Sequence, residues 1–350
     1  MPTTYAIPDG RTVMAATLYT GNATARTIAN TVNGISFQPD LVWLKMRSSG
    51  SYLNHHLVDS VRGDGKVLYS NLTNAEDNLG STVIYTTSTG FGLSAGVGVN
   101  ENSQSLVGWQ WNAGGSTVTN TDGTISAQVR ANPTAGCSVV TYTGNGLTNQ
   151  SVGHGLNATP GMVIIKQRDG TASWLVHHQS QPTGYTLYLN LTNAQDSGTS
   201  QWGTSAQTSS LFYVGYTAGA TGSNVNASTY VAYCFAPVDG YSAFGSYTGN
   251  GSANGPFVYT GFRPKFVMTK RTDATGGWVM LDSARDSYNV SGNILQAESS
   301  AAELAVASYP TLDILSNGFK MRSSTIQNAS GGTYIYMAFA ENPFKYANAR

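Results

Sequence analysis

Two adjacent histidine pairs are the residues best suited to metal binding or acid–base chemistry. His55-His56 and His177-His178 each lie in a β-type stretch of the sequence. Neighbouring side chains of a strand point to opposite faces, so neither pair can chelate one ion by itself. The chain holds three related copies of one pattern, described below, and no histidine position is common to all three. We therefore expect half-buried strand histidines, with no metal site.

A carboxylate position is the second candidate. Asp59 and Asp282 occupy matching places in the first and third copies, and each precedes an arginine by three residues, Arg62 or Arg285. The second copy has His178 there. Such a carboxylate could bind a sugar or a metal. It could equally cap its own turn and pair with the arginine, which is the interpretation we favour.

Asparagine-rich loops precede the last strand of each copy and could supply oxygen ligands for calcium. Only one of them carries a carboxylate, Glu101, which is too little charge for a tight site. Turns built on asparagine side chains are the better explanation. The loops are Asn100-Glu-Asn102, Asn224-Val-Asn226 and Asn328-Ala-Ser330.

The two cysteines, Cys137 and Cys234, are too few for a disulfide framework or a cysteine-based zinc site. Both fall in the second copy, near its first and last strands. We expect two buried thiols, with a disulfide as the alternative.

Four aromatic residues lie in or beside predicted loops: Tyr52, Trp202, Tyr216 and Tyr241. Amphipathic rings on loops suit contact with a glycan or a protein. They equally well cover the open ends of a β-sandwich. We take them as candidate contact residues for a ligand or partner.

Sequence signatures of the common enzyme classes are absent. The chain has no HExxH or P-loop pattern and no dinucleotide-binding fingerprint leading into a helix. Gly92-Leu-Ser-Ala-Gly96 has the spacing Gly-x-Ser-x-Gly, but no predicted helix follows it, as a nucleophile elbow or a phosphate loop requires. We therefore predict a protein that is not an enzyme, without catalytic residues, cofactor or metal.

The elements that would position these residues come from an internal repeat. The motif Tyr-Thr-Gly-Asn occurs at residues 19–22, 142–145 and 247–250, and each copy of the repeat ends in an aromatic-rich strand. The closing strands end at Trp111, Phe235 and Phe339. Internal repetition of this kind decides the architecture. It predicts an N-terminal arm over 1–13, a first repeat over 14–115, a linker over 116–136, and further repeats over 137–240 and 241–350.

A second shared pattern is Pro-x-x-Val-x-x-Lys, in strands that end at Lys45, Lys166 and Lys270. These runs are almost continuously apolar, which predicts strands covered on both faces, with the lysine returning the strand end to water. Many short strands, Gly/Asn turns and no long helical period predict an all-β fold. We expect three tandem antiparallel β-sandwich repeats of jelly-roll or concanavalin-like form.

Composition limits the partners. Lys+Arg and Asp+Glu both number 18, so the formal net charge is zero, which argues against a nucleic-acid binder. Only 10% of residues are charged, against about 25% in ordinary soluble proteins. No apolar run is long enough to span a membrane, and the first ten residues do not resemble a signal peptide.

The repeated motifs carry a family resemblance. Tyr142-Thr-Gly-Asn-Gly146, Leu189-Asn-Leu-Thr-Asn-Ala194 and Gly332-Thr-Tyr-Ile-Tyr-Met-Ala-Phe339 resemble a repeated domain of unknown function in virion proteins of tailed bacteriophages, especially marine phages and cyanophages. The resemblance extends from about residue 14 to the C-terminus. It implies no catalytic residues.

The resemblance sets the functional expectation. It implies a structural protein exposed on the virion, made in the host cytoplasm, as a tail fibre or host-surface adhesion component. The alternative is a decoration protein of capsid or tail with no ligand of its own. Expected partners are other virion proteins, further copies in a homotrimer, and a host-surface glycan or protein.

Overall fold

The computed structural model describes residues 5–50, 53–96, 98–198, 201–216, 222–305 and 307–343. Strands, with the turns and irregular loops between them, account for nearly all of them. Two short 3-10 helices, η1 (Gly10–Thr12) and η2 (Gly98–Asn100), are the helical elements among these residues. The all-β prediction is confirmed.

Three main sheets share one strand order: an opening strand, the closing strand, and then the third and fourth strands of the same segment, all antiparallel. The first is β1-β9-β3-β4 (Met14–Thr20, Ser105–Trp111, Leu41–Met46, His56–Asp59). The second contains β12-β18-β14-β15-β16 (Cys137–Thr143, Thr229–Phe235, Met162–Gln167, Leu175–His178, Leu187–Tyr188). The third is β19-β26-β21-β22-β23 (Ser242–Thr248, Thr333–Pro343, Phe262–Arg271, Trp278–Asp282, Leu295–Gln296).

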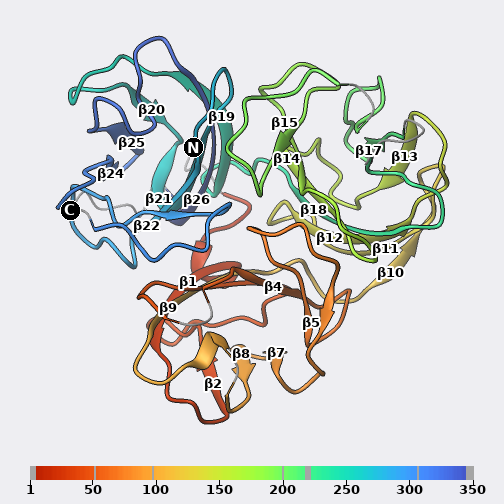
Figure 1. Ribbon diagram of the computed structural model, residues 1–350, viewed down its shortest axis with the longest axis horizontal. Coiled ribbons are helices and arrows are strands. Elements are labelled where there is room, and N and C mark those ends of the chain that lie inside the picture. The colour runs from red at the N-terminus through yellow and green to blue at the C-terminus, as the bar shows by residue number, and fades with distance from the viewer. Residues whose placement is uncertain are drawn as a thin grey trace.

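Each main sheet is paired with a small outer sheet, which gives the sandwich character that the sequence predicted (Figure 1). The small sheets are β2-β8-β7 (Arg26–Ala29, Gly90–Leu93, Ile84–Thr87), β13-β17 (Gln150–Gly153, Leu211–Val214) and β20-β25-β24 (Phe257–Tyr259, Gly318–Met321, Leu312–Leu315). A further pair, β5-β6 (Lys66–Val67, Asp77–Asn78), lies beside the first main sheet. We call these three units the first, second and third sandwich.

The continuously apolar strands are buried on both faces, as their sequence predicted. In β3, Leu41 and Trp43 belong to the central core, whereas Val42 and Leu44 belong to the outer core of the first sandwich. Strand β14 divides its residues in the same way between the central core and the outer core of the second sandwich. A strand covered on both faces has no need of polar alternation.

The three sandwiches, which form the three lobes of Figure 1, meet around one central core. The last aromatic residue of each closing strand reaches this centre. The ring centroids of Trp111 and Phe235 lie 6.0 Å apart, those of Trp111 and Phe339 5.8 Å, and those of Phe235 and Phe339 5.7 Å. Edge-to-face contacts at this spacing are favourable aromatic packing. The sandwiches therefore share a core, whereas the sequence suggested separate ones.

The stretch expected as a linker, 116–136, contains regular structure. Strands β10 (Val118–Asn120) and β11 (Ala127–Asn132) form a hairpin that continues the second main sheet beyond β12. Ile125 also makes a parallel bridge with Val152 of the outer sheet. Ala127 and Val129 pack into the outer core of the second sandwich, which holds the hairpin in place.

Candidate functional site

The three repeated lysines join one sandwich to the next and do not return to water. Lys45, Lys166 and Lys270 are fully buried. Each ammonium donates to the carbonyl of the residue after it and to a carbonyl in another sandwich: Ser300 for Lys45, Thr73 for Lys166, Thr192 and Asn193 for Lys270. Burial lowers the pKa of each lysine to about 8.

His55 is part of a second repeated contact. It occupies the place of Trp174 and Trp278, whose indole N–H groups donate to the carbonyls of Tyr69 and Tyr188 in the neighbouring sandwich at 2.9 and 2.8 Å. The His55 Nε2 atom lies 3.0 Å from the equivalent carbonyl, that of Gln296.

The other ring nitrogen of His55 fixes its tautomer. Trp43 Nε1 donates to His55 Nδ1 at 2.8 Å, so the ring proton is on Nε2 and donates to Gln296. Burial lowers the pKa of His55 well below its usual value. The ring is a neutral structural bridge between sandwiches, and both nitrogens are occupied.

The Asp59 and Asp282 carboxylates cap their own turns. Asp59 Oδ1 accepts from the main-chain N–H of Arg62 at 2.8 Å, and Asp282 Oδ1 accepts from that of Arg285 at 2.9 Å. The guanidinium of each arginine also pairs with its carboxylate. This confirms the turn-capping interpretation.

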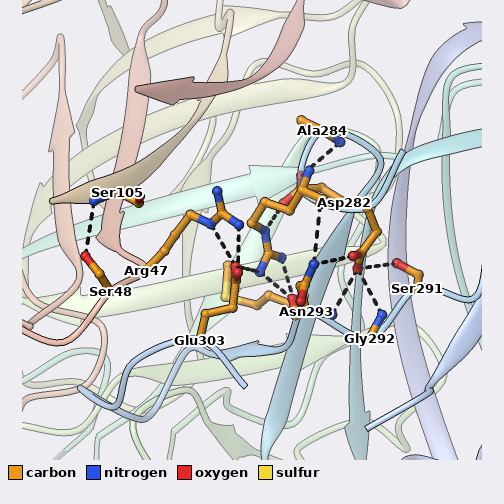
Figure 2. A network of polar contacts seen from close by, with 12 residues as sticks. Arg47, Ser48, Ser105, Asp282, Ala284, Ser291, Gly292, Asn293 and Glu303 are labelled. Carbon is orange, nitrogen blue, oxygen red and sulfur yellow. Dashed lines mark hydrogen bonds and ion pairs between the residues drawn. The ribbon is translucent and has the colours of Figure 1, made fainter. Parts of the chain in front are cut away.

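Each of these Asp–Arg pairs belongs to a series of ion pairs that connects two sandwiches. Glu303 binds both Arg285, at 2.9 Å, and Arg47 of the first sandwich, at 2.7 Å (Figure 2). Glu76 joins Arg62 to Arg168 of the second sandwich in the same way, with both distances 2.9 Å. Burial raises the pKa of Glu76, but the two arginines outweigh it and hold that pKa below its usual value.

The contact between the second and third sandwiches has uncharged residues at the positions of these ion pairs. His178, Gln181, Gln195 and Thr272 occupy the equivalent positions. The main-chain N–H of His178 donates to Gln181 at 2.9 Å, and that of Gln195 donates to the Thr272 carbonyl at 2.9 Å. Charged and neutral residues have been exchanged as a set. This pattern fits a structural contact better than a site of chemistry.

Hydrogen bonds join the Tyr-Thr-Gly-Asn motif to the asparagine loop of the same sandwich. In the second sandwich, Tyr142 donates to the Ser223 carbonyl at 2.6 Å, and Asn224 accepts from the Asn145 N–H at 2.9 Å. Tyr247 and Asn328 make the matching bonds in the third, at 2.8 and 2.9 Å. Asn100, Asn224 and Asn328 are fully buried. Within the described residues no cluster of histidine, cysteine and carboxylate side chains could hold a metal ion.

The four candidate contact aromatics are not gathered at one surface. Trp202 and Tyr241 are 1% exposed, Trp202 against His177 and Tyr241 against Phe339, so neither can meet a partner. Apolar ring area on these loops is used to close the cores, which is the alternative that the sequence left open. Tyr216 is half-buried, and Tyr52 lies outside the described residues.

The two cysteines are free and buried. Cys137 faces the central core and Cys234 the outer core of the second sandwich. Their side chains lie on opposite faces of the same sheet, which prevents a disulfide.

A pocket in the third sandwich is a further candidate site. Its volume is about 530 Å³, and it is lined by residues 285–290 with Ala307 and Pro310. The Tyr288 side chain is 80% exposed, the largest value among the exposed large hydrophobic residues that the structure describes. An open pocket beside an exposed aromatic side chain is a starting point for a ligand-site hypothesis.

Comparison with known proteins identifies the family. A family model described as a domain of unknown function, DUF7483, matches residues 9–343. The chain belongs to this family. The DUF7483 match runs unbroken across all three main sheets. No curated protein and no solved structure matches this DUF7483 chain. Among the helices that the structure describes, none is long and apolar enough to cross a membrane.

Proposed function

We propose that this DUF7483 protein is a non-enzymatic structural component of a tailed-bacteriophage particle. Its place would be the exposed tail, as a fibre or host-surface adhesion component, after synthesis in the host cytoplasm. The repeated motifs that resemble phage virion proteins support the assignment. The architecture supports a rigid building block, because three sandwiches enclose one core through buried contacts.

The observation that supports the structural role is the set of contacts made by the buried and paired polar residues. The repeated lysines, the Asp–Arg pairs and His55 all bind groups in another sandwich or within their own turn. Side chains that a catalytic site would draw on serve here to fix one sandwich against another. Such interlocking favours a durable exterior part.

A decoration protein of capsid or tail is the second candidate. The formal net charge of zero and the three-lobed form both suit a part that spreads its contacts over several neighbours. In that case the other virion proteins would be its partners, with no ligand of its own.

Immunogold labelling of purified phage particles, with antibodies against the recombinant chain, tests both candidates. Gold at the tail supports the fibre or adhesion role. Gold spread evenly over the capsid supports decoration and refutes the fibre role. Complete absence of the protein from particles, checked by mass spectrometry, overturns both.

The oligomeric state is a separate part of the proposal. A homotrimer would suit an exterior phage part with three-fold symmetry. A single chain already sets three similar sheets around one core, so a monomer could also fit a three-fold position. Native mass spectrometry decides between 36.9 kDa and three times that mass.

A further inference from the structure

We propose that the pocket beside Tyr288 binds a neutral saccharide. The inference deepens the proposed adhesion role and rests on it for its biological meaning. Its physical basis is the geometry of a loop that only the third sandwich possesses.

The pocket exists because this loop is longer than its counterparts. Asp282 and Leu295 are 13 positions apart, whereas Asp59 and Leu68 are 9 apart, as are His178 and Leu187. The additional residues fall between Arg285 and Asn293, because Arg285 reaches the Asn293 carbonyl as Arg62 reaches that of Lys66. The flanking contacts are otherwise retained, so the extra length forms the pocket wall.

The loop is held in shape before any ligand arrives. Asp286 accepts hydrogen bonds from the Ser291 hydroxyl at 2.8 Å and from the main-chain N–H groups of Gly292 and Asn293 at 2.9 and 3.0 Å. Figure 2 labels these three donor residues. Asn289 binds both the N–H and the carbonyl of Ile314, at 2.8 and 3.0 Å. A preformed loop loses little conformational entropy on binding.

The charged residues around the pocket argue against an ionic ligand. Arg285 and Asp286 are the charged residues among those described around the pocket, and each is only 8% exposed. Arg285 is already paired with Asp282 and Glu303, and Asp286 is held by the donors of its own loop. Neither is left to neutralise a charged ligand, because its partners already occupy it.

The exposed surface that remains suits a sugar ring. Tyr288 presents an aromatic face at 80% exposure, Pro310 and Val290 add apolar contact, and Ser287 offers a hydroxyl. The apolar C–H face of a pyranose packs on a tyrosine ring, while its hydroxyls bond to polar groups nearby. An open pocket of about 530 Å³ accepts one or two sugar units of a longer chain.

The test uses the whole chain and two matched variants. Tyr288→Ala removes the proposed stacking ring, and Tyr259→Ala removes another tyrosine of the third sandwich that is 66% exposed. Saturation-transfer NMR with methyl glucoside, methyl galactoside, methyl mannoside and N-acetylglucosamine measures binding to each. Dense immobilised forms of the same sugars, and heparin as an anionic comparison, raise weak binding to a detectable level.

We expect at least one neutral sugar to bind the native chain and the Tyr259→Ala variant equally. Tyr288→Ala should bind it at least about ten-fold more weakly with an unchanged melting temperature. Three results overturn the inference: no binding to any neutral sugar, binding retained by Tyr288→Ala, or binding to heparin alone. Particles labelled at the tail together with negative sugar tests refute the pocket and leave the proposed function standing. Sugar binding by a protein that is absent from particles supports the pocket and refutes the proposed function.

Discussion

Glu303 and Gln195 show how single residues decide the character of each contact between sandwiches. Both occupy the same position in the repeat, and the main-chain N–H of each donates to the neighbouring sandwich. Glu303 is matched by two arginines, whereas Gln195 faces Gln181 and Thr272. A buried charge is tolerated only with its partner, so the charged set and the neutral set are each internally consistent.

Replacing Glu303 by glutamine should lower the free energy of unfolding by about 3 kcal/mol, because it leaves the buried Arg285 and the partly buried Arg47 without their shared partner. That estimate is at the low end for a broken buried pair, since the Glu303 side chain keeps 12% exposure. Urea unfolding measures the loss. Gln195→Ala is the control and should cost about 1 kcal/mol. Equal losses for the two variants would contradict the charged-network description.

The buried histidines predict acid sensitivity. Burial lowers the pKa of His56, His177 and His178 to about 4, compared with about 6.5 for an exposed histidine. Folding therefore favours the neutral rings. Their contribution is complete above pH 6.5 and is lost as the pH falls from 6.5 towards 4.

We expect the free energy of unfolding, measured in urea, to fall between pH 6.5 and pH 4.5. Asp40 and Glu298, whose pKa burial raises, act in the opposite sense and reduce the fall. His56→Gln should lower the number of protons taken up on unfolding by up to about one. A stability that does not change over this range would show that the rings are solvated.

At the scale of elements, the turn after each opening strand sets the path of the chain. The glycine of Tyr-Thr-Gly-Asn lies against the main chain of the asparagine loop, and a Cβ on Gly144 would overlap the carbonyl oxygen of Val225. The tyrosine and asparagine bonds on either side of it hold turn and loop together. Glycine is needed here for close backbone approach.

Gly144→Ala should therefore destabilise the fold by about 1–3 kcal/mol, measured by chemical denaturation. Gly115→Ala is the matched control, because nothing lies within 4 Å of its Cβ position. The control should change stability by less than about 0.5 kcal/mol. If Gly144→Ala left stability unchanged but abolished ligand binding, the motif would be a site after all.

At the scale of the whole molecule, the shared core couples the three sandwiches. Trp111, Phe235 and Phe339 come from different sandwiches and contact one another at the centre. Each sandwich alone would expose the inner face of its main sheet to water. Burial of that apolar face is a dominant stabilising contribution.

We expect scanning calorimetry to show one cooperative transition, with equal calorimetric and van't Hoff enthalpies. Trp111→Ala should lower the stability of the whole chain by about 3–5 kcal/mol and keep the single transition. Three separate transitions, or loss of only one after this substitution, would show that the sandwiches fold independently.

The sequence by itself determined the local structure. Its repeated motifs, alternating and continuous apolar runs and glycine–asparagine turns predicted an antiparallel sandwich fold, and these signals are read within a few neighbouring residues. The turn-capping role of Asp59 also followed from local spacing.

Only the tertiary structure decided what lies between the sandwiches and at the surface. Lys45 was expected in water, but it is buried. Its carbonyl partner Ser300 lies 255 positions away in the sequence, so no local pattern indicates this contact. Trp202 and Tyr241 were candidates either for contact with a partner or for covering the sandwich ends, and packing in the assembled cores buries both. The pocket at Tyr288 depends on a loop of one sandwich meeting residues 307 and 310. Contacts between distant residues leave no local pattern in the chain, so they appear only when the sheets are assembled.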